Sequence, residues 1–190
     1  MNQILSYVIV FSIAVFIPGP GILALISYVV NQGKRSGFLL LCGLIVGNLF
    51  YLSIVFLGLN KFVSISCLTI ISGGYLIWFA YQLWGSRLVI EEQIPKKSNP
   101  LLQGTIVSLS NPKTMVFYLA ILPTIFTDID LQSKFLVYII TIIIFLGIGT
   151  LYIYSFKFLT VYLIKHQKII LRAVACVMAF LGLHNFCQIF

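Results

Sequence analysis

Residues 4–30 decide the fold and read ILSYVIVFSIAVFIPGPGILALISYVV, without a single charged side chain. A helix of about 20 apolar residues crosses the hydrocarbon core of a bilayer, so this run is long enough to span it. The run is interrupted at residues 17–21, which read IPGPG. The sequence therefore predicts a membrane-spanning helix that is broken partway along its length.

The remainder of the chain has the same apolar character. Of 190 residues, 61% are hydrophobic and 8% are charged, and the mean hydropathy is +1.10. A soluble domain carries roughly 25% charged residues, so a soluble fold is excluded. The four cysteines lie in apolar runs without metal-type spacing and are interpreted as packing residues. We predict no metal and no cofactor.

Six apolar runs are long enough to be spans, at residues 4–30, 38–59, 62–84, 101–126, 135–156 and 169–189. We predict an all-α membrane protein with a first three-span repeat at 1–90, a cytoplasmic linker at 91–100 and a second three-span repeat at 101–190. Because three is odd, the second half enters the membrane in the opposite sense. The six helices are therefore expected to form two inverted three-helix repeats, an arrangement that many transporters use.

Lysine and arginine are distributed unevenly between the predicted loops. The first, third and fifth loops, counted with Arg172 at the start of the sixth run, hold nine of them, and the second and fourth hold two. Cytoplasmic loops carry the excess, so both termini are predicted to lie outside the cytoplasm. This alternation also accounts for the net charge of +8 without a nucleic-acid partner.

The interruption consists of Pro18, Gly19, Pro20 and Gly21. Each proline lacks an N–H group and clashes with the preceding helical turn, so the helix must kink or break. Freed backbone groups at membrane depth are tolerated where protein or a water-filled cavity satisfies them. A simple packing kink is the alternative, but two prolines and two glycines in four positions favour a cavity-lining break.

Asn111, Pro112 and Lys113 occupy the corresponding place near the start of the second half. Asparagine is a good N-cap and proline is favoured at the first helical position, so a helix is predicted to begin here. Its N–H groups would favour a carboxylate. Apart from Arg172 at the start of the sixth run, Lys113 is the one basic residue within a predicted span, and it either contacts an anion or extends toward the cytoplasmic interface.

Gly33, Gly37, Gly43 and Gly47 would share one face if a single helix continued through them, and Gly43 and Gly47 predict close helix packing. Asn48 follows at the same depth. It is interpreted either as a substrate contact or, with some preference, as an interhelical hydrogen bond.

The acidic residues are absent from every predicted span, because all four of them lie in loops: Glu91, Glu92, Asp128 and Asp130. A proton relay of the usual carboxylate kind is therefore not predicted. His184 lies in the sixth run and is more often a packing residue than a relay. An enzyme is disfavoured because no acid stands beside either histidine.

These motifs, in this order, resemble those of the LysE/RhtB family of bacterial amino-acid exporters. The resemblance covers nearly the whole chain and includes Pro18-Gly19-Pro20, the glycine-spaced second span, residues 74–78 (GYLIW), Asn111-Pro112-Lys113 and Pro123. It implies a six-span exporter of the threonine, homoserine or lysine efflux type in the bacterial inner membrane. It also implies coupling to the proton gradient and, as an additional expectation, a homodimer.

The chain departs from that pattern in the fifth span. Many members carry an aspartate near the position of Leu146 or Gly147. Without that acid, a neutral amino acid is the favoured substrate, and a diverged membrane scaffold or channel-like protein is the alternative. The expected substrate-binding residues are Pro18, Gly19, Pro20, Gly21, Asn48, Asn111, Pro112 and Lys113.

Overall fold

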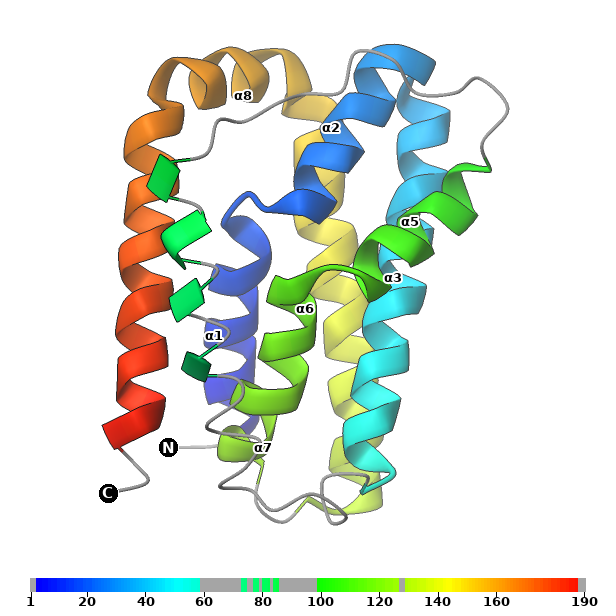
Figure 1. Cartoon of the computed structure of the whole chain (residues 1–190). Coiled ribbons are helices and arrows are strands. Elements are labelled where there is room, and N and C mark those ends of the chain that lie inside the picture. The colour runs from blue at the N-terminus through cyan, green and yellow to red at the C-terminus, as the bar shows by residue number, and fades with distance from the viewer. Residues whose placement is uncertain are drawn as a thin grey trace.

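The structure is a computed structural model that describes residues 3–58, 73–74, 77–78, 80–82, 84–85, 99–126 and 129–187. The secondary structure within these ranges consists of helices, and no strand occurs there (Figure 1). Their bounds are α1 (Gln3–Phe16), α2 (Pro20–Gln32), α3 (Lys34–Phe56), α5 (Pro100–Leu109), α6 (Pro112–Val116), the π-helix η2 (Phe117–Ile121), α7 (Leu122–Ile125) and α8 (Leu131–Cys187). The all-helical part of the prediction is confirmed for these ranges.

The first predicted span is broken where its prolines stand. Helices α1 and α2 meet at an angle of 51°, and together they are long and apolar enough to cross a membrane. Pro20 is the first residue of α2, where its missing N–H group costs nothing. The predicted break is therefore confirmed.

Two further helices are individually long and apolar enough to be spans. They are Lys34–Phe56, which is α3, and Leu131–Ser155, which is the first part of α8. Two to three candidate spans thus lie within the described ranges, and the six-helix inverted repeat stays a prediction. The predicted third span at 62–84 lies mostly outside the described residues, as does most of the linker at 91–100.

The predicted fourth span, residues 101–126, is a succession of short helices. Helix α5 ends before Ser110, and α6 starts after the N-cap Asn111. Pro123 has no N–H group for the Leu119 carbonyl, and the preceding turn widens into the π-helix η2. Each half of the chain therefore contains a helix that is broken close to a proline.

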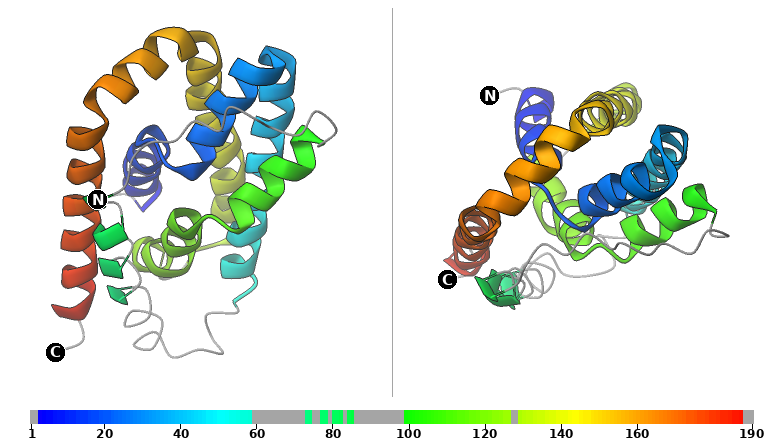
Figure 2. Two further views of the ribbon diagram at one scale, coloured as in Figure 1. Left: turned by 45° about the horizontal axis from the view of Figure 1, so that its top comes forward. Right: turned by 90° about the horizontal axis from the view of Figure 1, so that it is seen from above.

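The predicted fifth and sixth spans belong to one helical run, α8, of 57 residues. The loop expected between residues 156 and 169 is helical, and that part of the prediction is wrong. The sequence explains this, because neither glycine nor proline occurs between Gly149 and Gly182 to end the helix. Figures 1 and 2 show α8 rising beside α3, arching over and descending, so that its end lies at the same end of the molecule as the start of α1.

Helices α3 and α5 approach each other closely because glycines face one another. A Cβ atom on Gly43 would overlap the Leu101 carbonyl oxygen, and one on Gly104 would overlap the Leu40 carbonyl oxygen. Gly47 faces Ser108 in the same way, with 2.5 Å between its hypothetical Cβ and the serine Cβ. The predicted packing role of Gly43 and Gly47 is confirmed.

Gly33 does not belong to this glycine face. Its φ angle of +85° ends α2, and α3 begins only at Lys34. Positive φ suits glycine because it has no Cβ atom to clash with the backbone. The four glycines therefore do not lie on one continuous helix.

The α3–α5 contact gives a stability prediction. Gly43→Val should destabilise the protein by about 3 kcal/mol, because the new side chain forces two backbones apart. For a chain of this size that lowers Tm by roughly 6–12 °C in detergent micelles, measured by intrinsic fluorescence.

The matched control is Gly147→Val, because Gly147 is also helical and a Cβ atom there meets nothing within 4 Å. Its Tm should stay within about 2 °C of the parent value, since valine and glycine differ little in helix propensity. Equal Tm values for the two variants would contradict the proposed close packing.

Candidate binding site at the helix break

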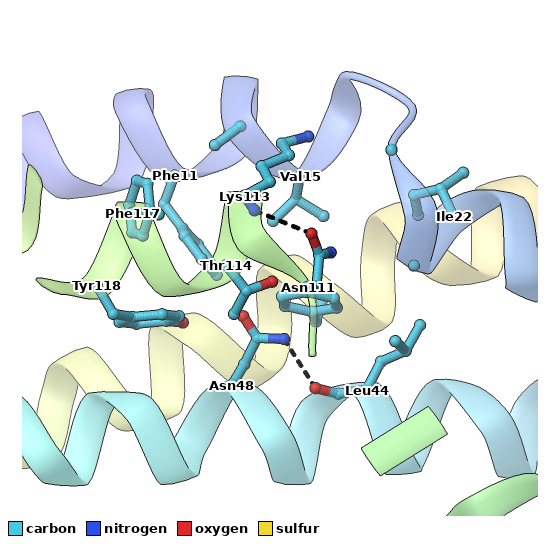
Figure 3. Close-up of a pocket in the computed structure, with 14 residues that line it drawn as sticks. Phe11, Val15, Ile22, Leu44, Asn48, Asn111, Lys113, Thr114, Phe117 and Tyr118 are labelled. Atoms are coloured by element: carbon cyan, nitrogen blue, oxygen red, sulfur yellow. Dashed lines mark hydrogen bonds between the residues drawn. The ribbon is translucent and has the colours of Figure 1, made fainter. Parts of the chain in front are cut away.

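A partly open cavity lies beside the break between α1 and α2 and is lined by residues of α1, α2, α3, α6, η2 and α8 (Figure 3). The centre of a water molecule can reach a volume of about 50 Å³ in this cavity. That is room for roughly four water molecules. The lining residues are Phe11, Ala14, Val15, Gly19, Gly21, Ile22, Leu44, Asn48, Asn111, Lys113, Thr114, Phe117, Tyr118 and Phe145.

The carbonyl groups at the end of α1 are satisfied by side chains from distant parts of the chain. In an unbroken helix the Phe16 carbonyl would accept from residue 20, but Pro20 has no N–H group. Tyr152 of α8 donates its hydroxyl to this carbonyl instead, at 2.7 Å. The next carbonyl, that of Ile17, accepts from the Lys113 ammonium group at 2.6 Å.

The start of α2 lies across the break and presents backbone donors. Gly19 is the N-cap and makes no side-chain hydrogen bond, and the first helical bond runs from Leu23 N to the Gly19 carbonyl. The N–H groups of Gly21 and Ile22 therefore have no acceptor within the helix. Because both residues line the cavity, the partly positive end of α2 faces the partly negative end of α1 there.

Asn111 caps α6 as predicted. Its Oδ1 accepts from Lys113 N at 3.0 Å, which occupies one of the N–H groups expected to bind a carboxylate. Its Nδ2 lies 3.8 Å from the position of a Cβ atom on Gly21. The side-chain amide therefore extends from α6 to the start of α2.

Lys113 makes a contact that the sequence did not predict. Its ammonium group donates into the break, to Ile17, rather than extending away along the helix surface. A Cβ atom on Gly19 would lie 3.3 Å from Lys113 Cδ, so the absence of a side chain at residue 19 leaves room for the lysine.

Asn48 makes the interhelical hydrogen bond that the sequence favoured. Its Nδ2 donates to Ser108 Oγ at 2.9 Å and to the Leu44 carbonyl at 2.8 Å. These bonds leave its Oδ1 unused, and Figure 3 shows this oxygen directed toward Thr114. Asn48 thus joins two helices and also presents an acceptor to the cavity.

Sequence reasoning missed two polar residues of the cavity, Thr114 and Tyr118. They follow Asn111 at offsets of three and seven, which places all three on one helical face. The Tyr118 hydroxyl is buried without a hydrogen-bond partner among the described residues. The offsets of three and seven from Asn111 were the sequence signal that could have identified Thr114 and Tyr118. Tyr152 carried none, because it lies 136 residues from its partner.

The structure brings five of the eight predicted site residues to the cavity wall. These are Gly19, Gly21, Asn48, Asn111 and Lys113, whereas Pro18, Pro20 and Pro112 shape the backbone without lining the cavity. The described ranges hold no group of His, Cys, Asp and Glu residues able to bind a metal. The arrangement is suited to noncovalent binding of a small molecule that carries both charges.

Comparisons with known proteins identify the family of the chain. The sequence model of the LysE type translocator family matches residues 12–188. The chain is 30% identical over 125 residues to YahN of Escherichia coli K12, an uncharacterized membrane protein, covering 58% of this chain and 55% of that one. It is 24% identical to the threonine efflux protein of the same organism, covering 60% of this chain and 62% of that one.

A third relative is the homoserine/homoserine lactone efflux protein of Salmonella typhimurium, which is 26% identical over 62% of each chain. The matches span 55–62% of the length of these relatives. No solved structure matches the chain. Since the family model covers nearly all of the sequence, the chain belongs to the LysE type translocator family.

Proposed function

We propose that this protein exports small neutral amino acids across the bacterial plasma membrane by secondary transport with alternating access. One observation carries the proposal. The interruptions at residues 17–21 and 110–113, one from each half of the chain, meet at a cavity between helix ends of opposite polarity. Sites at discontinuous helices are a recurrent feature of secondary transporters.

The two ends of the break complement the two charges of an amino acid. The carboxylate would accept from the N–H groups of Gly21 and Ile22 and from Asn111 Nδ2. The ammonium group would donate to the carbonyl end of α1 and to Asn48 Oδ1. Gly21, Ile22, Asn48 and Asn111 all line the cavity, and the assignment needs no charged partner from the protein for the ammonium group.

Two features favour a neutral and small substrate. No acidic residue lies in a predicted span, so a second ammonium group on the substrate would lack a counter-ion. The apolar walls, formed by Phe11, Phe117 and Phe145, enclose little space beyond that for a short side chain. The relatives named threonine and homoserine efflux proteins support the same substrate size.

The orientation of the chain in the membrane and its oligomeric state belong to the same proposal. The excess of Lys and Arg in alternate loops supports an orientation with both termini outside the cytoplasm. The basic connection between α2 and α3 then faces the cytoplasm, where an exported amino acid would enter. A homodimer stays an expectation from the family resemblance.

The site assignment predicts that Asn111→Ala and Pro18→Ala lower efflux. The first change removes the amide at the break, and the second gives Ala14 a helical donor again and so straightens α1. We expect about a tenfold fall in each case, corresponding to roughly 1.4 kcal/mol. The measurement is release of a labelled neutral amino acid from cells preloaded with its dipeptide.

The matched controls come from the other Asn-Pro pair. Asn99 caps α5 through a 3.1 Å bond to Leu101 N, and Pro100 is the first residue of that helix, away from the cavity. Asn99→Ala and Pro100→Ala should leave efflux within about twofold, because a lost N-cap costs about 1 kcal/mol without touching the site. Equal efflux from Asn111→Ala and Asn99→Ala cells at matched expression would count against the site.

The substrate class is tested separately by measuring the resistance of cells to toxic amino-acid analogues. Cells that overexpress the protein should grow in concentrations of toxic neutral analogues, such as those of threonine, that stop cells with the empty vector. Toxic lysine analogues should inhibit both strains equally, because the cavity offers no acid for a second ammonium group. Resistance to the lysine analogues alone would contradict the neutral substrate class.

A further inference from the structure

The ammonium group of Lys113 occupies the place where the ammonium group of an amino acid would be bound. It lies 2.6 Å from the Ile17 carbonyl oxygen at the partly negative end of α1, and this is its only hydrogen bond in the described part of the chain. A primary ammonium group on a helix-terminal carbonyl is chemically the same contact whether it comes from lysine or from a substrate.

We propose that Lys113 and the α-ammonium group of the transported amino acid take turns on the carbonyl end of α1. This inference rests on the proposed function. When an amino acid binds, its ammonium group replaces that of Lys113, which moves to the carboxylate near Gly21. When the amino acid leaves, Lys113 returns to the Ile17 carbonyl.

The physical reason lies in the break itself. A freed carbonyl at membrane depth needs a donor whether or not a substrate is present, because an unpaired buried group is unfavourable. A substrate satisfies this need only while it is bound. A donor belonging to the chain must therefore replace it during the step in which the unloaded carrier reorients.

The Lys113 side chain is able to move, whereas that of the neighbouring donor, Tyr152, is held in place. The lysine stem is flexible and passes Gly19, where the absence of a Cβ atom leaves space beside Cδ. Tyr152 holds the Phe16 carbonyl with a phenol hydroxyl, and it is largely buried, with 2% of its surface exposed. The Phe16 carbonyl is thus satisfied by a fixed group and the Ile17 carbonyl by a mobile one.

Measurements of net efflux and of exchange distinguish a mobile donor from a fixed one. Net efflux requires the carrier to return without a substrate, so it needs Lys113 on the Ile17 carbonyl. Exchange, with saturating amino acid on both sides, keeps the carrier loaded and requires no such return. Loss of the lysine should therefore reduce net efflux more strongly than exchange.

The test uses the purified full-length protein in proteoliposomes loaded with radiolabelled L-alanine, L-serine or L-threonine. Release is measured into amino-acid-free buffer and into buffer with a saturating unlabelled amino acid. For Lys113→Met we expect the ratio of net efflux to exchange to fall about tenfold, because an unpaired carbonyl disfavours the unloaded carrier.

Two reference variants separate this effect from structural damage. Tyr152→Phe removes a fixed donor from the same break, so net efflux and exchange should fall together and their ratio should stay constant. Lys134→Met is the same substitution at a lysine that lies 3.5 Å from the Phe56 carbonyl, outside the cavity. Its ratio should equal that of the parent protein.

A Lys113→Met ratio equal to the parent ratio would overturn the inference, since Lys113 would then act as Tyr152 does. If that variant fails to fold, Lys113→Leu provides the same comparison, because it also leaves the Ile17 carbonyl without a donor, and the same fall in the ratio is expected. Absence of amino-acid flux from the parent protein in both buffers would instead refute the proposed function on which the inference rests.

Discussion

The constraint on which the structure depends is the need of each freed carbonyl at the α1–α2 break for a new donor. Pro18 and Pro20 remove two of the N–H groups that would have completed the helix. The donors at the Phe16 and Ile17 carbonyls are Tyr152 and Lys113, from α8 and α6. Because lipid offers no hydrogen bonds, these long-range contacts hold three distant segments of the chain against one another.

A second contact sets the depth at which the two interruptions meet. The facing glycines Gly43 and Gly104 allow α3 and α5 to touch through their backbones, and Asn48 fixes their register by donating to Ser108. Since α5 ends just before Asn111, this register determines where α6 begins. Packing between two helices thereby places the N-cap amide beside Gly21, and the cavity follows from helix contact as much as from the break.

The sequence predicted the features that depend on local chemistry. The break at Pro18–Gly21, the N-cap at Asn111 and the close face at Gly43 and Gly47 each follow from what a proline, an asparagine or a glycine does to its own helix. The continuity of α8 was missed because its charged residues resembled a loop, although no glycine or proline stands there to end the helix.

The features that the sequence did not predict depend on tertiary contacts. Nothing near Lys113 indicates that its partner is the Ile17 carbonyl, 96 residues away, and nothing near Tyr152 indicates Phe16. The sequence shows which helical carbonyl loses its N–H partner, because proline has no N–H group to donate. The identity of the group that satisfies it depends on how the helices cross, which one sequence without its fold does not reveal.

The same lysine bears on how the site selects charge. A zwitterion adds no net charge beside Lys113, whereas a substrate with a second ammonium group adds a positive one. At a separation of ~6 Å and an effective dielectric constant of ~20, that repulsion is about 3 kcal/mol, or roughly a hundredfold in affinity. An aspartate in the fifth span would offset it, but residues 144–149 read IFLGIG and supply none. In the proposed function, selection of neutral substrates would therefore be a Coulombic consequence of a basic residue at the break with no acid to balance it.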